Sequence, residues 1–286
     1  MRLFISLRPK MVGGGANTFA FNLWNWAKKN GIRLSANIMN ADRAVIIAHN
    51  ADIELVKKAR QKGCYMVHRL DEYFQDDEDG YRKQKHQKII ELNQYADITI
   101  FQSKFVFDNV FPYLNCKRHD IILNGADANR FSAPQEPGEF IGHVTWGIGD
   151  IKRLDLVQRF VQYHPDEKFL LIGNHCRSKV NFRQFKNIKI AGRVARRKLP
   201  HFYKMMKMLY FPSEREPCPN IPIEAILCGV PVCYNEYGGT KEIVRDCGLP
   251  LAQAEELLQD LSVFRQRCLG RKDLYFDQVA RQYMSA

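Results

Sequence analysis

The sequence predicts an α/β protein built from two parallel, doubly wound sheets. Short apolar runs alternate with amphipathic, helix-like segments along the chain. This alternation is typical of parallel sheets that are covered by helices on both faces. A segment rich in proline and polar residues, SAPQEPGE (132–139), interrupts the alternation near the middle. A length of 286 residues suits two domains of ordinary size.

The first half begins with the apolar run RLFISL (2–7), a glycine-rich turn and an amphipathic helix that extends to about residue 31. The strands AVIIAHN, CYMVHRLD, ITIFQS and HDIILNGAD follow, and helix-like segments such as ADIELVKKARQKG and KFVFDNVF separate them. We expect these elements to form an N-terminal Rossmann-like domain over residues 1–133, with a C-terminal helix at about 272–286 packing back onto it.

The alternation restarts after the proline-rich segment. The expected strands are FIGHVTW, KFLLIGN, IKIAGRV, MLYFPSE and VPVCYNE, and the expected helices are DLVQRFVQYHP, KLPHFYKMMK and IPIEAILCG. These elements predict a second Rossmann-like domain over residues 138–271.

The composition is that of a globular protein, with 45% hydrophobic and 26% charged residues. No apolar run approaches the roughly 18 residues of a membrane-spanning helix. The eight cysteines include no C-x-x-C pair and no Cys/His cluster of metal-site spacing. We therefore expect reduced core cysteines in a cytoplasmic protein.

The net charge of +12 is concentrated in basic clusters such as KKARQK (57–62), RKQKHQK (82–88) and RVARRK (193–198). Such clusters attract phosphates, nucleic acid or anionic membranes, and they are also found on ordinary solvated surfaces. No nucleic-acid-reading motif or aromatic platform accompanies them. The sequence therefore predicts no nucleic-acid partner and leaves peripheral contact with an anionic membrane open.

Ligands of parallel sheets bind beyond the carboxyl ends of the strands. The notable loops of this sequence fall at such ends. They cover residues 13–15, 68–71, 147–153, 173–174 and 213–220.

The stretch PSEREPCPNIPIEAILCGVPV (212–232) follows one of these strands and carries Glu216 and Glu224. Asn220 is expected to cap a helix whose first amides would hold an anion such as phosphate. Two carboxylates beside a phosphate site suit a ligand with hydroxyl groups at both ends, as in a nucleotide sugar. The alternative is structural: Glu216 would stabilise the loop and Glu224 would be an ordinary helix residue.

The same stretch resembles the donor-site signature of family 4 retaining glycosyltransferases, which have the GT-B fold. The resemblance extends to NEYGGTKEIVRDCG (235–248), ILNGADANRF (122–131) and IFQSKFVFDNV (100–110). It implies two Rossmann-like domains that face a central cleft. It also implies a retaining, metal-independent hexosyltransferase that uses a UDP- or GDP-linked sugar and a glycan or lipid-linked acceptor.

The resemblance implies roles for individual residues. Glu216 would contact hydroxyls of the transferred sugar and Glu224 those of the ribose, while Lys152 would hold the diphosphate. The family usually has Lys-Gly at this point, whereas this chain has IKRLD (151–155), so Arg153 could supply a second positive charge. The alternative for Lys152 is a surface lysine at a helix start.

The remaining implied positions lie in both halves of the chain. His68 would lie beside the reacting carbon of the donor, and its alternative is a structural histidine under an acidic loop. The full implied set is catalytic Glu216, His68 and Lys152, with donor binding by Gly14, Gly15, Lys152, Arg153, Val194, Asn220, Ile221 and Glu224.

The acidic segment DDEDG (76–80) does not predict a metal site. A calcium loop that began one residue earlier would place Gln75 at its first position and His86 at its twelfth, where carboxylates are required. We therefore expect no metal and no cofactor. Two alternatives to a transferase stay open: a nucleotide-sugar epimerase of GT-B shape, and a non-catalytic nucleotide- or nucleic-acid-binding protein on the same fold.

Overall fold

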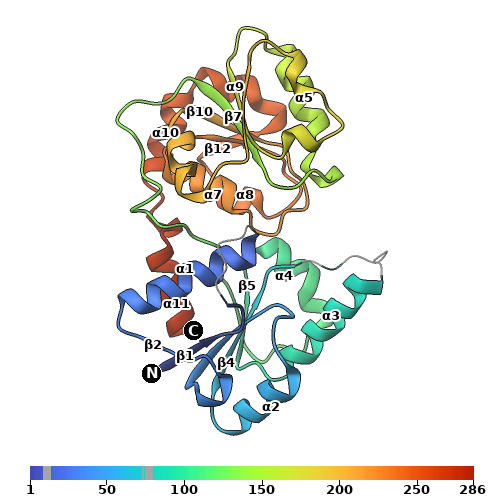
Figure 1. The fold of residues 1–286 in the computed structure, drawn as a ribbon, viewed down its shortest axis with the longest axis vertical. Helices are drawn as coiled ribbons and strands as arrows, with labels where there is room; N and C mark the ends of the chain where they lie inside the picture. Colours follow the sequence, from blue (N-terminus) through green and yellow to red (C-terminus); the bar gives the residue numbers. More distant parts are fainter. Residues whose placement is uncertain (9–13, 73, 75–79) are drawn as a thin grey trace. The chain divides into compact units, whose positions relative to one another are not determined.

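The computed structural model describes residues 1–8, 14–72, 74 and 80–286. The chain divides into two compact units, which are described separately (Figure 1). Unit 1 consists of Met1–Asn124 together with Phe276–Ala286, and unit 2 is Gly125–Tyr275.

Unit 1 is built on a parallel sheet with the strand order β2-β1-β3-β4-β5-β6. Its strands are β1 (Arg2–Ile5), β2 (Arg33–Leu34), β3 (Arg43–Ile47), β4 (Tyr65–Leu70), β5 (Ile98–Phe101) and β6 (His119–Ile121). Its helices are α1 (Gly15–Lys29), α2 (Ile53–Gln61), α3 (Gly80–Asn93), α4 (Lys104–Val110) and α11 (Phe276–Ser285).

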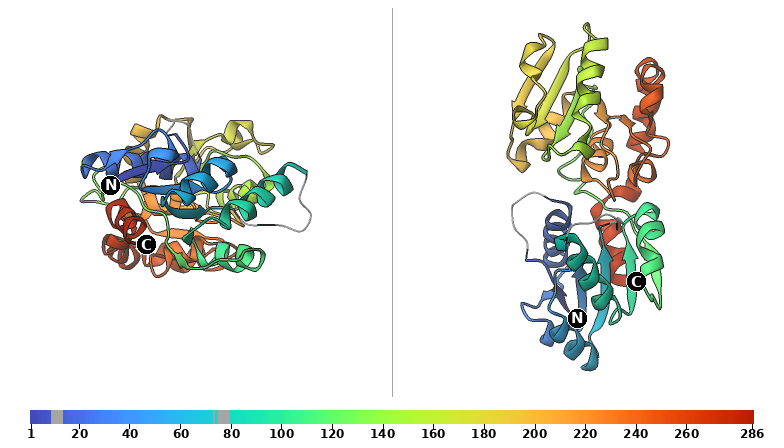
Figure 2. Two further views of the ribbon diagram at one scale, coloured as in Figure 1. Left: turned by 90° about the horizontal axis from the view of Figure 1, so that it is seen from below. Right: turned by 90° about the vertical axis from the view of Figure 1, so that its right-hand side faces the viewer.

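Helices cover both faces of this sheet, and the layers can be followed in Figure 2. On one face, α1 and α11 pack together through Phe19, whose ring centroid lies 4.8 Å from that of Tyr283. On the other face, Val56 of α2, Ile89 of α3 and Val106 of α4 are buried. The last helix therefore completes the core that the first strand begins.

Unit 2 has a second parallel sheet with the order β12-β11-β10-β7-β8-β9. Its strands are β7 (Phe140–Thr145), β8 (Phe169–Gly173), β9 (Ile188–Gly192), β10 (Met206–Phe211), β11 (Val232–Tyr234) and β12 (Gly248–Pro250). Its helices are α5 (Leu154–Tyr163), α6 (Leu199–Lys204), α7 (Asn220–Leu227), α8 (Thr240–Val244), α9 (Ala254–Gln259) and α10 (Leu261–Leu269).

The central strands of unit 2 are almost fully apolar because helices shield both of their faces. Met208 and Tyr210 of β10 pack with α5, α9 and α10, whereas Leu209 points to the opposite face and is fully buried. β7 pairs with β10 on one side and with β8 on the other. The loops that follow these three strands therefore lie at one edge of the sheet.

The predicted α/β class and the two parallel sheets are confirmed. The short strands β2 and β12, with two and three residues, were not predicted, because such lengths show no hydrophobic period. The boundary between the units falls at Asn124–Gly125 rather than in the proline-rich segment. That segment belongs to unit 2, where Arg265 donates a hydrogen bond to the carbonyl of Pro134 at 2.6 Å.

Candidate functional site

The structure brings Lys152 and Glu216 together at the carboxyl edge of the unit 2 sheet. Lys152 ends a short 3-10 helix after β7, and Glu216 lies in the loop after β10. The two loops are joined by a backbone hydrogen bond from Glu214 to Ile151 at 2.9 Å. The Lys152 ammonium forms an ion pair with the Glu216 carboxylate.

Both partners of this ion pair are held in a partly buried position. The side chains of Lys152 and Glu216 are 19% and 15% exposed. An ammonium carries three donors, so Lys152 can donate to an anionic ligand in addition to Glu216. The pair therefore combines a cation for phosphate with an acceptor for hydroxyl groups.

Two glycines make room for the pair. Gly238 has φ 136°, and a Cβ atom there would lie 3.0 Å from the backbone nitrogen and oxygen of Glu216. The next residue, Gly239, donates its amide to the carbonyl of Glu216 at 2.8 Å. A Cβ atom on Gly147 would lie 3.1 Å from Cε of Lys152. Gly147 belongs to a loop that the sequence placed at a strand end, and Gly238 and Gly239 belong to segment 235–248, which carries the family resemblance.

Arg153 does not offer the free second charge that was expected from the sequence. Its backbone is left-handed, with φ 46°, and its guanidinium binds both oxygens of Asp155 at 3.1 and 3.2 Å. It also donates to Glu214 at 3.2 Å. The hydrogen bonds that Arg153 donates to Asp155 raise the pKa of this arginine. This arginine therefore connects the loops after β7 and β10 and is already neutralised by carboxylates.

Helix α7 begins beside Glu216, but its cap differs from the prediction. Pro219 occupies the N-cap position with extended backbone, and Asn220 is the first helical residue. A proline has no side-chain oxygen to accept a hydrogen bond, and no side chain caps the helix. The first amides, which belong to Asn220 and Ile221, therefore have neither an intrahelical partner nor a cap. Both residues are partly exposed.

Glu224 lies one turn into α7 and is buried, with 6% exposure. The hydroxyl of Tyr203 on α6 donates to it at 2.9 Å. Burial raises the pKa of Glu224 to about 7, against the opposing effects of the Tyr203 hydrogen bond and the charges of Arg196 and Arg130. Near neutral pH this carboxyl group is therefore poised between its two protonation states.

Val194 follows β9 and is partly exposed. It is in the same unit as Lys152, Glu216 and Glu224. Unit 2 therefore holds all of the predicted donor-site residues except His68, Gly14 and Gly15.

His68 is in unit 1, where it is a core histidine with 1% exposure. Its Nε2 lies 3.0 Å from the carbonyl of Ala48, and its Nδ1 lies 3.0 Å from the amide nitrogen of Asn93. Burial lowers the pKa of His68 to about 4. These contacts fit the structural alternative, and a role for His68 beside the donor sugar stays a prediction.

Gly14 and Gly15 also lie in unit 1. Gly14 is the N-cap of α1 with φ 112°, a conformation that favours glycine, and Gly15 is the first helical residue. Gly13 of the predicted glycine loop lies outside the described residues, as do the acidic residues 76–79.

Two buried groups near the site were not predicted from the sequence. Tyr203 lies in the predicted helix KLPHFYKMMK, where no pattern marked it, and it is the partner of Glu224. His143 and His175 form a pair with 2.6 Å between Nδ1 and Nε2. Burial lowers the pKa of both histidines. In the sequence, only the Gly-Asn turn at 173–174 pointed to the region of His175. The apolar run that forms β7 gave no indication of a role for His143.

The described part of the chain contains no cluster of three or more histidine, cysteine, aspartate or glutamate side chains that could hold a metal ion. Within the same residues, every helix is too short or too polar to traverse a lipid bilayer.

Solved structures with similar folds cover nearly the whole chain. The crystal structure of Anabaena Alr3699/HepE in complex with UDP gives a TM-score of 0.74 at 14% identity and covers 99% of this chain and 98% of that one. Sucrose-phosphate synthase (tll1590) from Thermosynechococcus elongatus gives 0.75 at 16% identity, with 99% and 97% covered. The chain has the GT-B fold.

Within this GT-B chain, residues 142–263 match the family described as Glycosyl transferases group 1. The match contains Lys152, Glu216 and Glu224. The Vi polysaccharide biosynthesis protein VipC/TviE of Salmonella typhi is 29% identical over 115 residues, which is 38% of this chain. The match spans only 20% of the Salmonella protein.

Proposed function

We propose that this chain is a retaining, metal-independent glycosyltransferase that moves a hexose from a nucleoside-diphosphate sugar to a glycan or lipid-linked acceptor. The observation that carries the proposal is the Lys152–Glu216 ion pair beside the uncapped first turn of α7. The group 1 match over residues 142–263 supports the same reading.

The donor diphosphate would bind between Lys152 and the first amides of α7. A helix N-terminus and an ammonium both favour an anion there. The leaving diphosphate gains negative charge as the sugar departs, so these groups would stabilise the transition state more than the ground state. This arrangement needs no metal ion and no cofactor.

Glu216 and Glu224 would bind the two ends of the donor. When Lys152 moves to the diphosphate, Glu216 is released to accept hydrogen bonds from the transferred sugar. Glu224 would accept hydrogen bonds from the ribose hydroxyls in its deprotonated form. Complexes of the structurally similar Alr3699/HepE with UDP and UDP-glucose support a nucleotide-sugar donor, and either a uridine or a guanosine diphosphate suits this chemistry.

Transfer with retention would follow an internal-return path. The bond between the anomeric carbon and the diphosphate oxygen breaks, and an acceptor oxygen bonds to that carbon on the same face. The leaving phosphate oxygen takes the acceptor proton. His68, enclosed in unit 1, would position the end of β4 rather than touch the sugar.

The acceptor would be a glycan or a lipid-linked sugar, and the protein would act in the cytoplasm. The similarity to a polysaccharide biosynthesis protein supports a glycan acceptor. Exposed lysines of unit 1, including Lys57 and Lys58 on α2 and Lys62 at its C-cap, would allow peripheral contact with an anionic membrane.

The experiment that tests the proposal is a panel of UDP-, GDP- and ADP-linked hexoses with mixed glycan acceptors. We expect acceptor-dependent release of one nucleoside diphosphate and a product that keeps the anomeric configuration by NMR. Interconversion of donor sugars without release would indicate an epimerase. Binding without turnover across the panel would indicate a non-catalytic protein.

A further inference from the structure

A long basic segment forms one edge of unit 2. Residues 174–198 contain nine lysines and arginines and no aspartate or glutamate. The acid-free stretch is longer still, because no acidic residue occurs between Glu167 and Glu214. The segment runs from the end of β8 through β9, which is the last strand of the sheet. Nine of the 43 lysines and arginines of the chain therefore lie at this edge, with no acidic residue among them.

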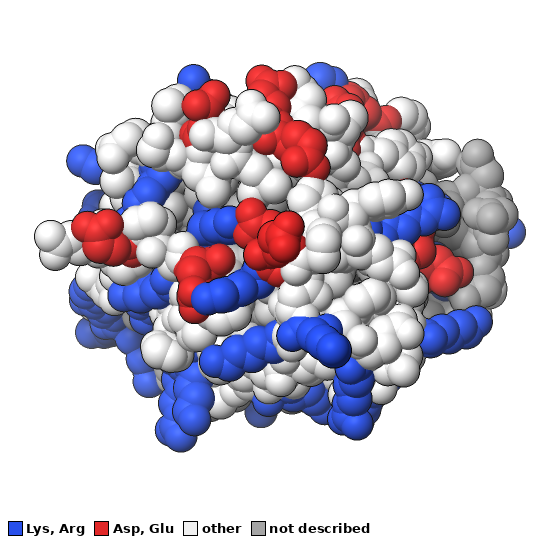
Figure 3. Space-filling view, turned by 90° about the horizontal axis from the view of Figure 1, so that it is seen from above, with Lys and Arg blue, Asp and Glu red and all other residues white. Residues whose placement is uncertain are grey.

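Eight of these cations are exposed to solvent. They are Arg177, Lys179, Arg183, Lys186, Lys189, Arg193, Arg197 and Lys198. Among the described residues, none of the eight takes part in an ion pair. The nearby acid Glu167 is already paired with Lys207 at 2.5 Å. Figure 3 shows lysine and arginine side chains gathered along the lower side of the view with few acidic neighbours.

The basic segment is longer than a donor nucleotide requires. One end meets the proposed donor site, where Asn174 contacts the carbonyl of Trp146. From there the connection crosses to the amino end of β9, where Asn187 donates to the carbonyls of His164 and Glu167 at 3.1 Å. The five residues of β9 alone span about 16 Å. The cations of the β8–β9 connection therefore extend away from the edge where a nucleotide sugar would bind.

A role in protecting an edge strand explains only part of this charge. Lysine on an edge strand discourages pairing with another chain. Lys189 lies on β9 itself, over the ring of Phe140 at 5.8 Å, and fits that role. Lys179, Arg183 and Lys186 lie in the connection before the strand, where there is no strand edge to protect.

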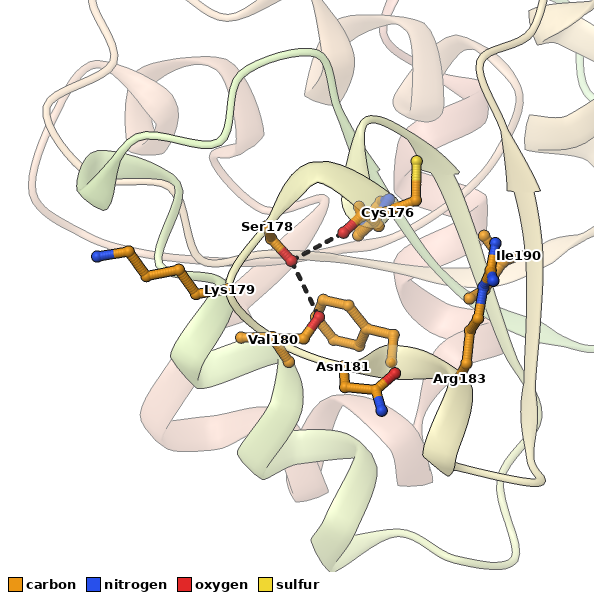
Figure 4. A pocket seen from close by; sticks show the side chains of 9 residues that line it. Cys176, Ser178, Lys179, Val180, Asn181, Arg183 and Ile190 are labelled. Atoms are coloured by element: carbon orange, nitrogen blue, oxygen red, sulfur yellow. Dashed lines mark hydrogen bonds between the residues drawn. The ribbon is translucent and has the colours of Figure 1, made fainter.

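A pocket of about 300 Å³ opens within the basic segment (Figure 4). Its lining includes Ser178, Lys179, Asn181 and Arg183. The hydroxyl of Ser178 donates to the carbonyl of His175 at 2.8 Å and so holds the loop that forms the pocket wall. Cations beside amide groups suit a carboxylated or sulfated sugar unit, which needs both charge and hydroxyl partners.

We propose that this edge binds an anionic polysaccharide, which rests on the proposed function in taking the polymer to be the acceptor or product glycan. The segment lacks what two other polyanions require. A single-stranded nucleic acid needs exposed aromatic rings for stacking, but Phe182 is buried and Phe185 is partly buried. A membrane surface is bound more strongly where apolar side chains insert, and no large apolar side chain of the segment is exposed.

The test is binding of polygalacturonate to the whole chain at low salt, without donor sugar, with dextran as the neutral polymer. The edge variant carries Lys179→Gln, Arg183→Gln, Lys186→Gln and Lys189→Gln. The control variant removes the same charge from exposed lysines of unit 1 through Lys28→Gln, Lys29→Gln, Lys83→Gln and Lys117→Gln. We expect polygalacturonate to bind and dextran not to bind. The edge variant should lose about ten-fold or more in affinity, and added salt should remove the difference.

Several results would overturn the proposal. These are equal losses in both variants, equal binding of dextran, tighter binding of poly(U) RNA at matched charge, or binding of anionic vesicles that the edge variant loses. Donor-dependent release of nucleoside diphosphate is measured in parallel on the wild type and both variants. Turnover by a wild-type chain that binds no polymer would reject this inference alone. Polymer binding that depends on the edge, without turnover for any donor, would reject the proposed transferase and leave the binding surface in place.

Discussion

The ammonium of Lys152 and the carboxylate of Glu216 form an ion pair although 64 positions separate them in the sequence. The pair exists because β7 and β10 are neighbours in the sheet and their following loops are hydrogen bonded. Each partner keeps the other satisfied when no ligand is bound. A donor that supplies a diphosphate and sugar hydroxyls could replace both interactions at once.

Replacement of each partner should have different effects on binding and turnover. Glu216→Gln should lower kcat about ten- to a hundred-fold, because a charged hydrogen bond contributes about 1.5–3 kcal/mol, while affinity for the nucleoside diphosphate is kept. Lys152→Gln should weaken that affinity by a similar factor. Calorimetry and initial rates measure the two quantities. Lys168→Gln, an exposed lysine paired with Glu139, is the matched control. Small, equal effects from both site variants would mean that the donor binds elsewhere.

Glu224 should make the stability of unit 2 fall as pH rises. Its pKa is raised from 4.5 to about 7 by burial, so between these values the folded state holds a proton that the unfolded state releases. The free energy of unfolding should therefore decrease from pH 5 to pH 8, by up to about 3 kcal/mol. Urea midpoints of the wild type and Glu224→Gln measure this, with exposed Glu139→Gln as control. If the free energy of unfolding of Glu224→Gln changes with pH as that of the wild type does, this carboxyl group does not titrate in that range.

His68 should matter for stability more than for turnover. His68→Ala removes the ring that contacts the carbonyl of Ala48 and the side-chain amide of Asn93, and it opens a cavity. The cost should be about 2–4 kcal/mol of unfolding free energy. Its pKa of about 4 lies below the ordinary value of 6.5, so its contribution is present above pH 6.5 and is lost as pH falls towards 4. Thermal melts and kcat per folded molecule separate the two roles. A melting point equal to wild type with kcat lowered a hundred-fold would restore a catalytic role.

Turnover should survive removal of divalent metal ions. Lys152 and the first amides of α7 already provide the positive potential that a diphosphate requires. Initial rates after EDTA treatment and gel filtration should match the untreated rates within about two-fold. Loss of activity that manganese or magnesium restores would contradict the lysine-based model and direct attention to the acidic residues 76–79.

Helix α2 should determine any association with anionic membranes. Sedimentation with phosphatidylserine-containing liposomes should rise with anionic lipid and fall with salt, because each lysine near such a surface contributes about 1 kcal/mol. The variant Lys57→Gln, Lys58→Gln and Lys62→Gln should remain in the supernatant. Arg60 is left unchanged because it pairs with Asp97 at 2.5 Å. A wild-type protein that stays in the supernatant at low salt would make a soluble acceptor the better proposal.

The fold was predictable because most of the parallel strands are apolar runs followed by a loop and a helix. The runs KFLLIGN and MLYFPSE overlap β8 and β10, and the predicted loops follow these two strands. The strand order was not predictable, because no local pattern states that β10 lies beside β7. The contact between Lys152 and Glu216 depends on that order and appears only in the folded chain.

The site was predictable in residue type more than in detail. Arg153 was expected to supply charge to a ligand, but its left-handed backbone directs it to Asp155 and Glu214. Asn220 was expected to cap α7, but Pro219 precedes the helix with extended backbone and takes that position. The burial of His68 and Glu224 depends on long-range packing, which a local sequence pattern does not reveal.

Unit 1 is completed by α11, and this has a consequence for synthesis on the ribosome. Phe276 and Tyr283 fill the space beside Phe19, yet they are translated more than 150 residues after Asn124. At about 5–20 residues per second, the first sheet waits roughly 8–30 s for its final helix. That interval is the time in which unit 2 is translated, and its last residue, Tyr275, directly precedes α11. During this time the apolar face of the first sheet is a natural binding site for a chaperone.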